Sequence, residues 1–121
     1  MARNFVQAGH TLDFVNPGPN AVAAGDVVVA GTLLGVALVD IAPQATGSVA
    51  LEGVFECPKE LGVAFAQGQA LACEIDTGAF AAELSSGPRA EGLGAVAFAA
   101  ASAEAQTVLV KFTGVPCVVS Q

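Results

Sequence analysis

The sequence contains no Trp and no Tyr, and only 12% of its 121 residues are charged. A typical soluble domain carries about 25% charged residues, so this chain supplies an unusually charge-poor surface. Four Lys and Arg residues stand against eleven Asp and Glu residues, which gives a formal net charge of −7. Binding to a phosphate backbone needs clustered cations, and base or sugar stacking needs aromatic platforms. The composition therefore argues against a nucleic-acid partner and against a stacking site.

The chain also lacks paired cysteine motifs and long hydrophobic runs. Its three cysteines, Cys57, Cys73 and Cys117, are odd in number and have no CxxC spacing, which argues against a disulfide framework or a zinc site. We expect them to be buried thiols in a reducing compartment. The charge-free stretch 27–39 is too short to span a bilayer, and the N-terminus does not have the pattern of a signal peptide. We therefore expect a soluble protein with no membrane partner, used without export.

Apolar residues, in contrast, are abundant, at 54% of the chain. A chain of this length forms one domain, and one small domain does not easily bury so much apolar surface. We expect part of this surface to be covered by further copies of the chain or by a partner.

Short apolar runs separated by Gly, Pro and Asn are typical of an all-β domain. Strands are expected over residues 11–15, 26–30, 33–39, 48–56, 70–76, 79–84, 94–100 and 107–113. Gly31-Thr32 and Thr77-Gly78 are expected to close two hairpins. Residues 95–105 are Ala-rich, but the alternation of Val96 and Phe98 favours a strand followed by a loop, and residues 58–66 have room for one helical turn. The prediction is a compact single-domain β-barrel-like or β-sandwich fold with at most one short helix, an extended N-terminal arm (1–10) and a β domain (11–121).

A weak internal repeat supports this prediction. Residues 34–38 (LGVAL) are similar to residues 93–98 (LGAVAF), and residues 49–54 (VALEGV) are similar to residues 110–115 (VKFTGV). Chance similarity remains an alternative in a chain so rich in Ala, Val and Gly. Two copies of one β unit would favour a closed or nearly closed structure without exposed sheet edges.

No catalytic pattern stands out. His10 is the single histidine, and a strand would place Asp13 on the opposite side. The carboxylates of Glu52, Glu56 and Glu60 would align only on a helix, which Gly53 and Pro58 interrupt. The serines lack a nucleophile elbow, and the glycines of residues 87–94 lack a phosphate-binding pattern. We expect no enzyme activity, no metal and no cofactor.

Carrier domains also have two similar β halves, but they present a modified Lys at an exposed hairpin tip. Lys111 lies inside a predicted strand, and Lys59 follows Cys57-Pro58. Both positions argue against a carrier function.

Several segments, in order and spacing, resemble the small capsid cement (head decoration) proteins of tailed bacteriophages and prophages. They are residues 4–9 (NFVQAG), 25–28 (GDVV), 33–37 (LLGVA), 49–55 (VALEGVF), 67–68 (QG), 94–101 (GAVAFAAA) and 108–112 (VLVKF). Residues 114–117 (GVPC) extend beyond the last strand of the family pattern, so the C-terminal tail has no assignment from it.

The resemblance implies a structural virion protein that binds the outside of the expanded head as a homotrimer and clamps neighbouring major capsid protein subunits. It implies synthesis in the host cytoplasm and a final location on the outer capsid surface. We expect the arm residues Arg3, Asn4, Phe5, Val6 and Gln7 to contact the capsid by strand addition, with Phe5 and Val6 as anchors and Arg3 paired with an acidic surface. The alternatives are a first strand within the protein's own sheet or a disordered terminus for the arm. For the whole chain, the alternative is a self-assembling β module of another virion part (tail or baseplate) or a small-ligand binder.

Overall fold

The computed structural model describes residues 9–120, and these residues form eleven strands and no helix. The strands are β1 (Thr11–Val15), β2 (Val27–Ala30), β3 (Leu33–Ala37), β4 (Thr46–Ala50), β5 (Glu52–Pro58), β6 (Ala72–Glu74), β7 (Phe80–Ala81), β8 (Arg89–Glu91), β9 (Ala95–Ala97), β10 (Thr107–Thr113) and β11 (Val118–Ser120). The prediction of an all-β fold is confirmed. The division into an arm and a domain stays a prediction, because residues 1–8 lie outside the described part.

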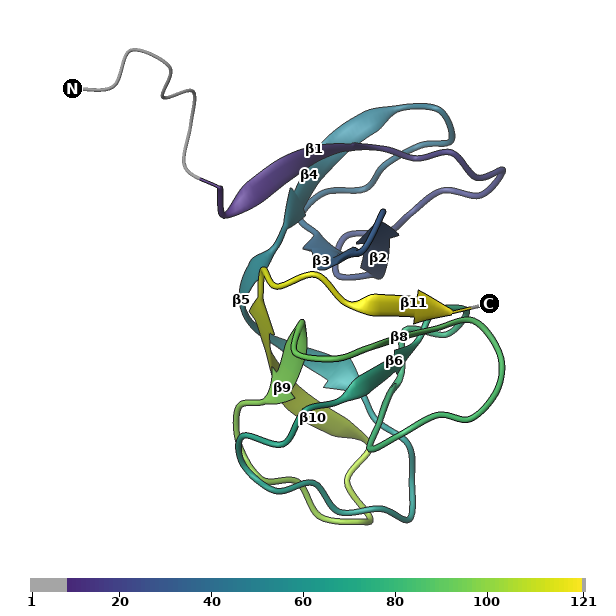
Figure 1. Ribbon diagram of the computed structural model, residues 1–121. Coiled ribbons are helices and arrows are strands. Elements are labelled where there is room, and N and C mark those ends of the chain that lie inside the picture. Colours follow the sequence, from purple (N-terminus) through teal and green to yellow (C-terminus); the bar gives the residue numbers. More distant parts are fainter. Residues whose placement is uncertain (1–8, 121) are drawn as a thin grey trace, which may run out of the picture.

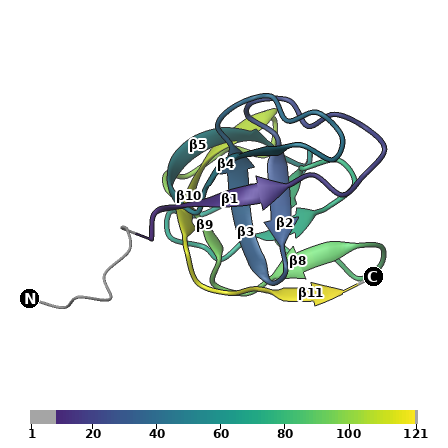
Figure 2. The same cartoon turned by 90° about the horizontal axis from the view of Figure 1, so that it is seen from above.

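The strands form three antiparallel sheets (Figure 1). The first sheet has the order β1-β4-β3-β2, the second β5-β10-β9, and the third β11-β8-β6-β7. In Figure 1 the first sheet lies in the upper part of the molecule and the second in the lower part, and the chain passes from β4 into β5 along one side. Seen from above in Figure 2, β1 crosses in front of the other strands of the first sheet, and β8 and β11 run side by side.

Both predicted hairpins form. In the first, Ala30 pairs with Leu33, which leaves Gly31 and Thr32 as a two-residue turn, and Gly31 adopts a φ of 65°. A positive φ at the first turn residue is what such tight hairpins require, and Gly adopts it without strain. In the second hairpin β6 pairs with β7, and Thr77 donates its hydroxyl proton to Glu74 Oε1 at 3.0 Å within the turn.

The prediction of one strand over residues 48–56 is wrong. The chain leaves the first sheet after Ala50 and enters the second sheet at Glu52. Leu51 donates its backbone N–H to the His10 carbonyl at 2.8 Å, and Gly53 turns the chain with a φ of 132°. The apolar alternation continues across this change of sheet, so the pattern alone contains no sign of it.

Two strands were not predicted. β8 lies within residues 87–94, which were expected to form a loop, and β11 lies in the unassigned C-terminal tail. These two strands pair with each other through Val119 and Ala90, and Ala90 also pairs with Cys73 of β6. Strands of three residues form because a distant partner is present, and a local pattern cannot predict such a partner.

The core consists of one large and one small cluster of buried residues. Phe112 occupies the large cluster and contacts Phe55 and Phe80 in edge-to-face geometry, with ring centroids 5.8 and 5.9 Å apart. Leu34 and Val36 of the first sheet also belong to the large cluster. The small cluster contains Val28, Ala37, Ile41 and Val49, all from the first sheet or the loop after β3. The first sheet therefore packs partly against its own small core and partly against the rest of the molecule.

The structure confirms the internal repeat and extends it. Residues 11–50 (the first unit) and 54–111 (the second unit) share one pattern of hydrogen bonds. Val22 and Ile41 exchange two backbone bonds, at 2.9 and 2.7 Å, and Phe65 and Ala101 exchange the same two, at 2.9 and 3.0 Å. The similarity also includes a side-chain bond in the turn before the second strand: Ala23 N–H donates to Asp26 Oδ2, and Ala66 N–H donates to Gln69 Oε1, both at 2.9 Å.

The repeat also explains the third sheet. In the first unit, Gly31 and Thr32 connect β2 directly to β3. The corresponding connection in the second unit runs from β6 to β9 and contains β7 and β8. β7 and β8 are therefore an insertion into the second unit, and they form the third sheet by pairing with β6, with the C-terminal β11 as an edge strand.

Candidate functional site

The outer face of the second sheet exposes apolar side chains around one cation. Along β10, Val108, Val110 and Phe112 are buried, whereas Leu109 and Lys111 point outward, as the two-residue alternation of a strand dictates. Directly opposite residues on paired strands share a face, so Val54 and Val96 flank Lys111 on its two sides. We call this surface the β10 face and define it by Val54, Val96, Phe98, Leu109 and Lys111.

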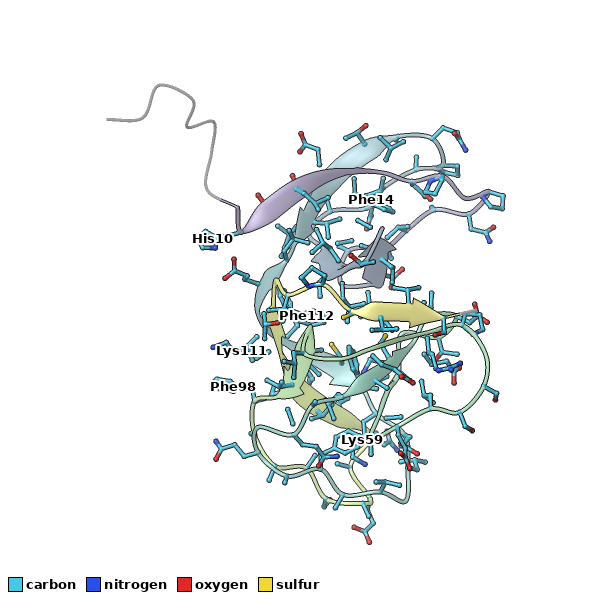
Figure 3. All side chains as sticks on the ribbon, in the orientation of Figure 1. His10, Phe14, Lys59, Phe98, Lys111 and Phe112 are labelled. Carbon is cyan, nitrogen blue, oxygen red and sulfur yellow. The ribbon has the colours of Figure 1, made fainter. Side chains whose placement is uncertain are left out.

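Phe98 completes the face beside Leu109. Its backbone N–H donates to the Leu109 carbonyl at 2.8 Å, which continues the pairing of β9 with β10 by one residue. Phe98 is 48% exposed and Leu109 is 41% exposed. Figure 3 shows Phe98 and Lys111 close together on the same side of the molecule, both pointing away from its body. Large apolar side chains that stay exposed together in this way are typical of an interaction surface.

Carboxylates lie along the β5 edge of this face. Glu56 is opposite Leu109 and accepts a hydrogen bond from the Thr107 hydroxyl at 3.1 Å. Glu52 lies 3.0 Å from His10, measured between Oε2 and Nδ1, and both side chains are largely exposed. His10 is labelled on the same side of the molecule as Lys111 and Phe98 in Figure 3. The described chain therefore begins beside the acidic edge of the β10 face.

The three predicted thiol positions are all buried, and none forms a disulfide. Burial and, secondarily, the Glu56 carboxylate raise the pKa of the Cys57 thiol to about 11. Burial raises the pKa of Cys73 to about 12, with further contributions from Cys57, Cys117 and Glu74. Burial also raises the pKa of Cys117, against an opposing hydrogen bond with the Gly94 backbone. Neutral, enclosed thiols are poor nucleophiles, so these side chains serve the core.

The candidate catalytic residues are not brought together. Glu52 contacts His10, Glu56 contacts Thr107, and Glu60 accepts a hydrogen bond from the Ala82 N–H at 3.1 Å. Within residues 9–120, no group of His, Cys, Asp and Glu side chains is arranged to hold a metal ion. The same residues include no helix long and apolar enough to cross a bilayer.

Two surface hollows remain. One of about 350 Å³ lies between β2 and the turn after β6 and presents the carboxylates of Asp26 and Asp76 beside Thr77. The other, of about 330 Å³, is lined by Leu61, Gly62, Ala103, Glu104 and Gln106. In the first hollow Asp26 already accepts the Ala23 N–H, which explains its position structurally.

The sequence-based candidates and the β10 face do not coincide. Arg3, Asn4, Phe5, Val6 and Gln7 lie outside the described residues, so their assignment stays a prediction. The sequence-based prediction places Lys111 inside a strand and argues against a carrier lysine, but it does not predict an exposed apolar face around it. The alternation of residues 107–113 (TVLVKFT) contains the signal, because it places Leu109 and Lys111 on one side.

Comparison with known proteins identifies one family. No curated protein and no solved structure matches the chain. A family model described as phage cement protein matches residues 6–112, which include nine of the strands, β1 to β9, and most of β10. The chain therefore belongs to the phage cement protein family, which implies a structural role at the viral capsid.

Proposed function

We propose that this protein binds the outer surface of the expanded phage head as a homotrimer and stabilises contacts between major capsid protein subunits, with no enzymatic role. The observation that carries the proposal is the family match over residues 6–112. The apolar, charge-poor surface supports it, since 54% of the residues are apolar and the β10 face leaves several of them exposed.

The physical basis of such a role is preferential binding. A protein that binds the assembled, expanded lattice and not its separated subunits stabilises the lattice by mass action. The gain is about 2.7 kcal/mol per site when the free protein is present at 100 times its dissociation constant. A rigid β body is suited to this task because little conformational entropy is lost when it docks.

The arm residues Arg3 to Gln7 are proposed to contact the capsid. An extended segment can add a strand to an exposed sheet edge through main-chain hydrogen bonds, while Phe5 and Val6 fill pockets. Arg3 is proposed to pair with an acidic capsid group. The family match begins at Val6, so part of this segment belongs to the family pattern.

Co-sedimentation with expanded, empty heads of the parent phage tests the proposal. The full-length protein is compared with a variant that lacks residues 2–8. We expect saturable binding of the full-length protein and at least a tenfold loss of affinity in the shortened one. Equal binding by both would retain the head-binding role and reject the arm contact. Binding by neither would reject the role, and binding to purified tails would then identify another virion site.

A further inference from the structure

We propose that the β10 face is the surface of the protein body that docks onto the phage head. This inference rests on the proposed function and adds to it the part of the folded domain that makes the contact. The partner surface that contacts this face is an apolar area of the major capsid protein, with a carboxylate opposite Lys111.

The charge distribution distinguishes the β10 face from the remaining surface. The chain has four Lys and Arg residues and a net charge of −7. Among residues 9–120, Lys59 is 5% exposed and Arg89 is paired with Glu91 at 2.9 Å, whereas Lys111 is exposed and has no ion pair within this part of the chain. Lys111 is flanked by Val54 and Val96, and the carboxylates of Glu52 and Glu56 lie along the β5 edge of the same face. A cation next to apolar side chains complements an apolar surface with a carboxylate, and such complementarity orients a docking partner.

The first unit shows that the fold does not require this apolar face. Thr11 and Ser48 occupy the positions that correspond to Val54 and Leu109. Val36 corresponds to Val96 but is buried in the large core cluster, where it packs within the molecule. The second unit therefore has apolar side chains at Val54 and Leu109, where the first unit has polar ones, and Val96 is less buried than Val36. At the remaining position both units expose an apolar side chain, Leu38 in the first and Phe98 in the second. A role outside the fold explains the difference at Val54 and Leu109.

The position of the chain's start connects this face with the proposed arm. His10 contacts Glu52, the first residue of β5, and lies on the same side of the molecule as Lys111 (Figure 3). Eight further residues precede Gly9. A segment of that length spans up to about 27 Å when extended. The arm and the β10 face can therefore reach one and the same capsid surface.

The repeat provides matched controls for the test. Leu38 and Phe98 occupy corresponding positions. The Leu38 N–H donates to the Ser48 carbonyl, and the Phe98 N–H donates to the carbonyl of Leu109, which corresponds to Ser48. Leu38 is 45% exposed and Phe98 is 48% exposed. The variants Phe98→Glu and Leu109→Glu are compared with Leu38→Glu and Ser48→Glu, which add the same charge at corresponding exposed positions. Lys111→Glu serves as a further variant that replaces one exposed polar residue by another and so leaves the packing intact.

The measurement is a head-binding isotherm by co-sedimentation for each full-length protein, with its sedimentation velocity and thermal unfolding measured in the absence of heads. We expect Phe98→Glu, Leu109→Glu and Lys111→Glu to weaken head binding at least tenfold, and both first-unit variants to bind like the natural protein. Loss of about this size is typical of residues at the centre of an interface. The oligomeric state in solution is expected to be the same in all variants.

Three results would overturn the inference. Equal binding by natural and β10-face variants would place the contact elsewhere, with the head-binding role intact. Dissociation of the free oligomer by the β10-face variants alone would identify the face as a contact between copies. Failure of the natural protein to bind would instead reject the proposed function. If Phe98→Glu or Leu109→Glu unfolds, the head-binding isotherm of Lys111→Glu tests the inference instead.

Discussion

At the scale of single residues, Asn16 and Lys59 are the buried polar side chains of residues 9–120, and they occupy corresponding positions in the two units. The Asn16 amide donates to the carbonyls of Asn20 and Ile41, at 2.8 and 3.2 Å, and its Oδ1 accepts the Gly18 N–H at 3.0 Å. Burial of a polar group is tolerated only when such bonds replace its hydration. Asn16 therefore fastens the turn after the first strand of its unit.

The buried ammonium group of Lys59 has different partners from the Asn16 amide. Its ammonium group donates to the Glu60 carbonyl at 2.7 Å and lies 4.9 Å from the centroid of the Phe65 ring. A cation over an aromatic face is attracted by the ring's negative potential. This contact and the carbonyl hold the charged end at the turn after β5, which is incompatible with a mobile carrier arm at this position.

The buried thiols lead to a prediction about alkaline pH. The folded state retains protons on Cys57 and Cys73 up to about pH 11 and 12, whereas the unfolded thiols ionise near their ordinary value of 9.0. Above pH 9 the unfolded state therefore binds fewer protons, and the free energy of unfolding falls as pH rises, by up to about 1.4 kcal/mol per pH unit for each thiol. Below about pH 8 these thiols contribute no pH dependence.

Urea unfolding followed by circular dichroism at pH 7, 8, 9 and 10 measures this effect. The chain contains no Tyr, so no phenol titrates in this range. A Cys73→Ala variant should show a shallower decline between pH 9 and pH 10 than the natural protein. An equal decline in the two proteins would show that the Cys73 thiol is not the source.

At the scale of elements, one pair of packed positions has its large and small side chains exchanged between the two units. In the loop and strand of the first unit, Gly47 faces Ile41, and a Cβ added at Gly47 would lie 2.5 Å from Ile41 Cγ1. The corresponding residues of the second unit are Val108 and Ala101. A small residue on the strand thus accompanies a large one in the loop, and the reverse holds in the other unit. The total volume is conserved, as a close-packed interior requires.

This exchange predicts a compensating pair of substitutions. Gly47→Val alone should destabilise the protein by about 1–3 kcal/mol through overpacking. Ile41→Ala alone should cost about 2–5 kcal/mol through the cavity it leaves. The double variant reproduces the pair of the second unit and should lose less than the sum of the two, with a coupling of about 0.5–3 kcal/mol. Urea unfolding of the four proteins measures the coupling, and strictly additive losses would contradict the exchange.

The secondary structure also shows which strands a local sequence pattern can predict. The two hairpins, β1 and β10 were predicted because alternation and Gly-containing turns act over a few residues. β8 and β11 were not predicted because they are short strands whose partners lie far along the chain: β8 pairs with β6 and β11, and β11 pairs with β8. The repeat was predicted only for the second half of each unit, although residues 21–25 and 64–68 in the first halves share an Ala-x-Ala-x-Gly pattern.

At the scale of the whole molecule, the two units are not independent. Leu34 and Val36 of the first unit are buried in the same cluster as Val110 and Phe112 of the second. The small cluster of the first unit has only four buried residues of its own. A core of this size cannot offset the conformational entropy of forty residues, so the first unit depends on the second.

We therefore expect the two units to unfold in one cooperative step. Ile41 and Ala101 donate corresponding backbone hydrogen bonds, to Val22 and Phe65. Native-state hydrogen exchange should give both amides the same free energy of opening, equal to that of global unfolding. A smaller opening energy at Ile41, independent of denaturant, would show instead that the first unit opens alone.

The all-β class, the two hairpins and the alternation that places Leu109 and Lys111 on one side of a strand follow from the amino-acid sequence alone. These features depend on side-chain chemistry and backbone preferences within a few residues. Three further features depend on long-range packing: Val36 is buried while Leu109 is exposed, the chain changes sheets after Ala50, and Lys59 is buried. Burial depends on which surfaces meet after folding. Leu34 and Val36 of the first unit pack in one cluster with residues of the second unit, whereas Phe98 and Leu109 of the β10 face stay 48% and 41% exposed within residues 9–120.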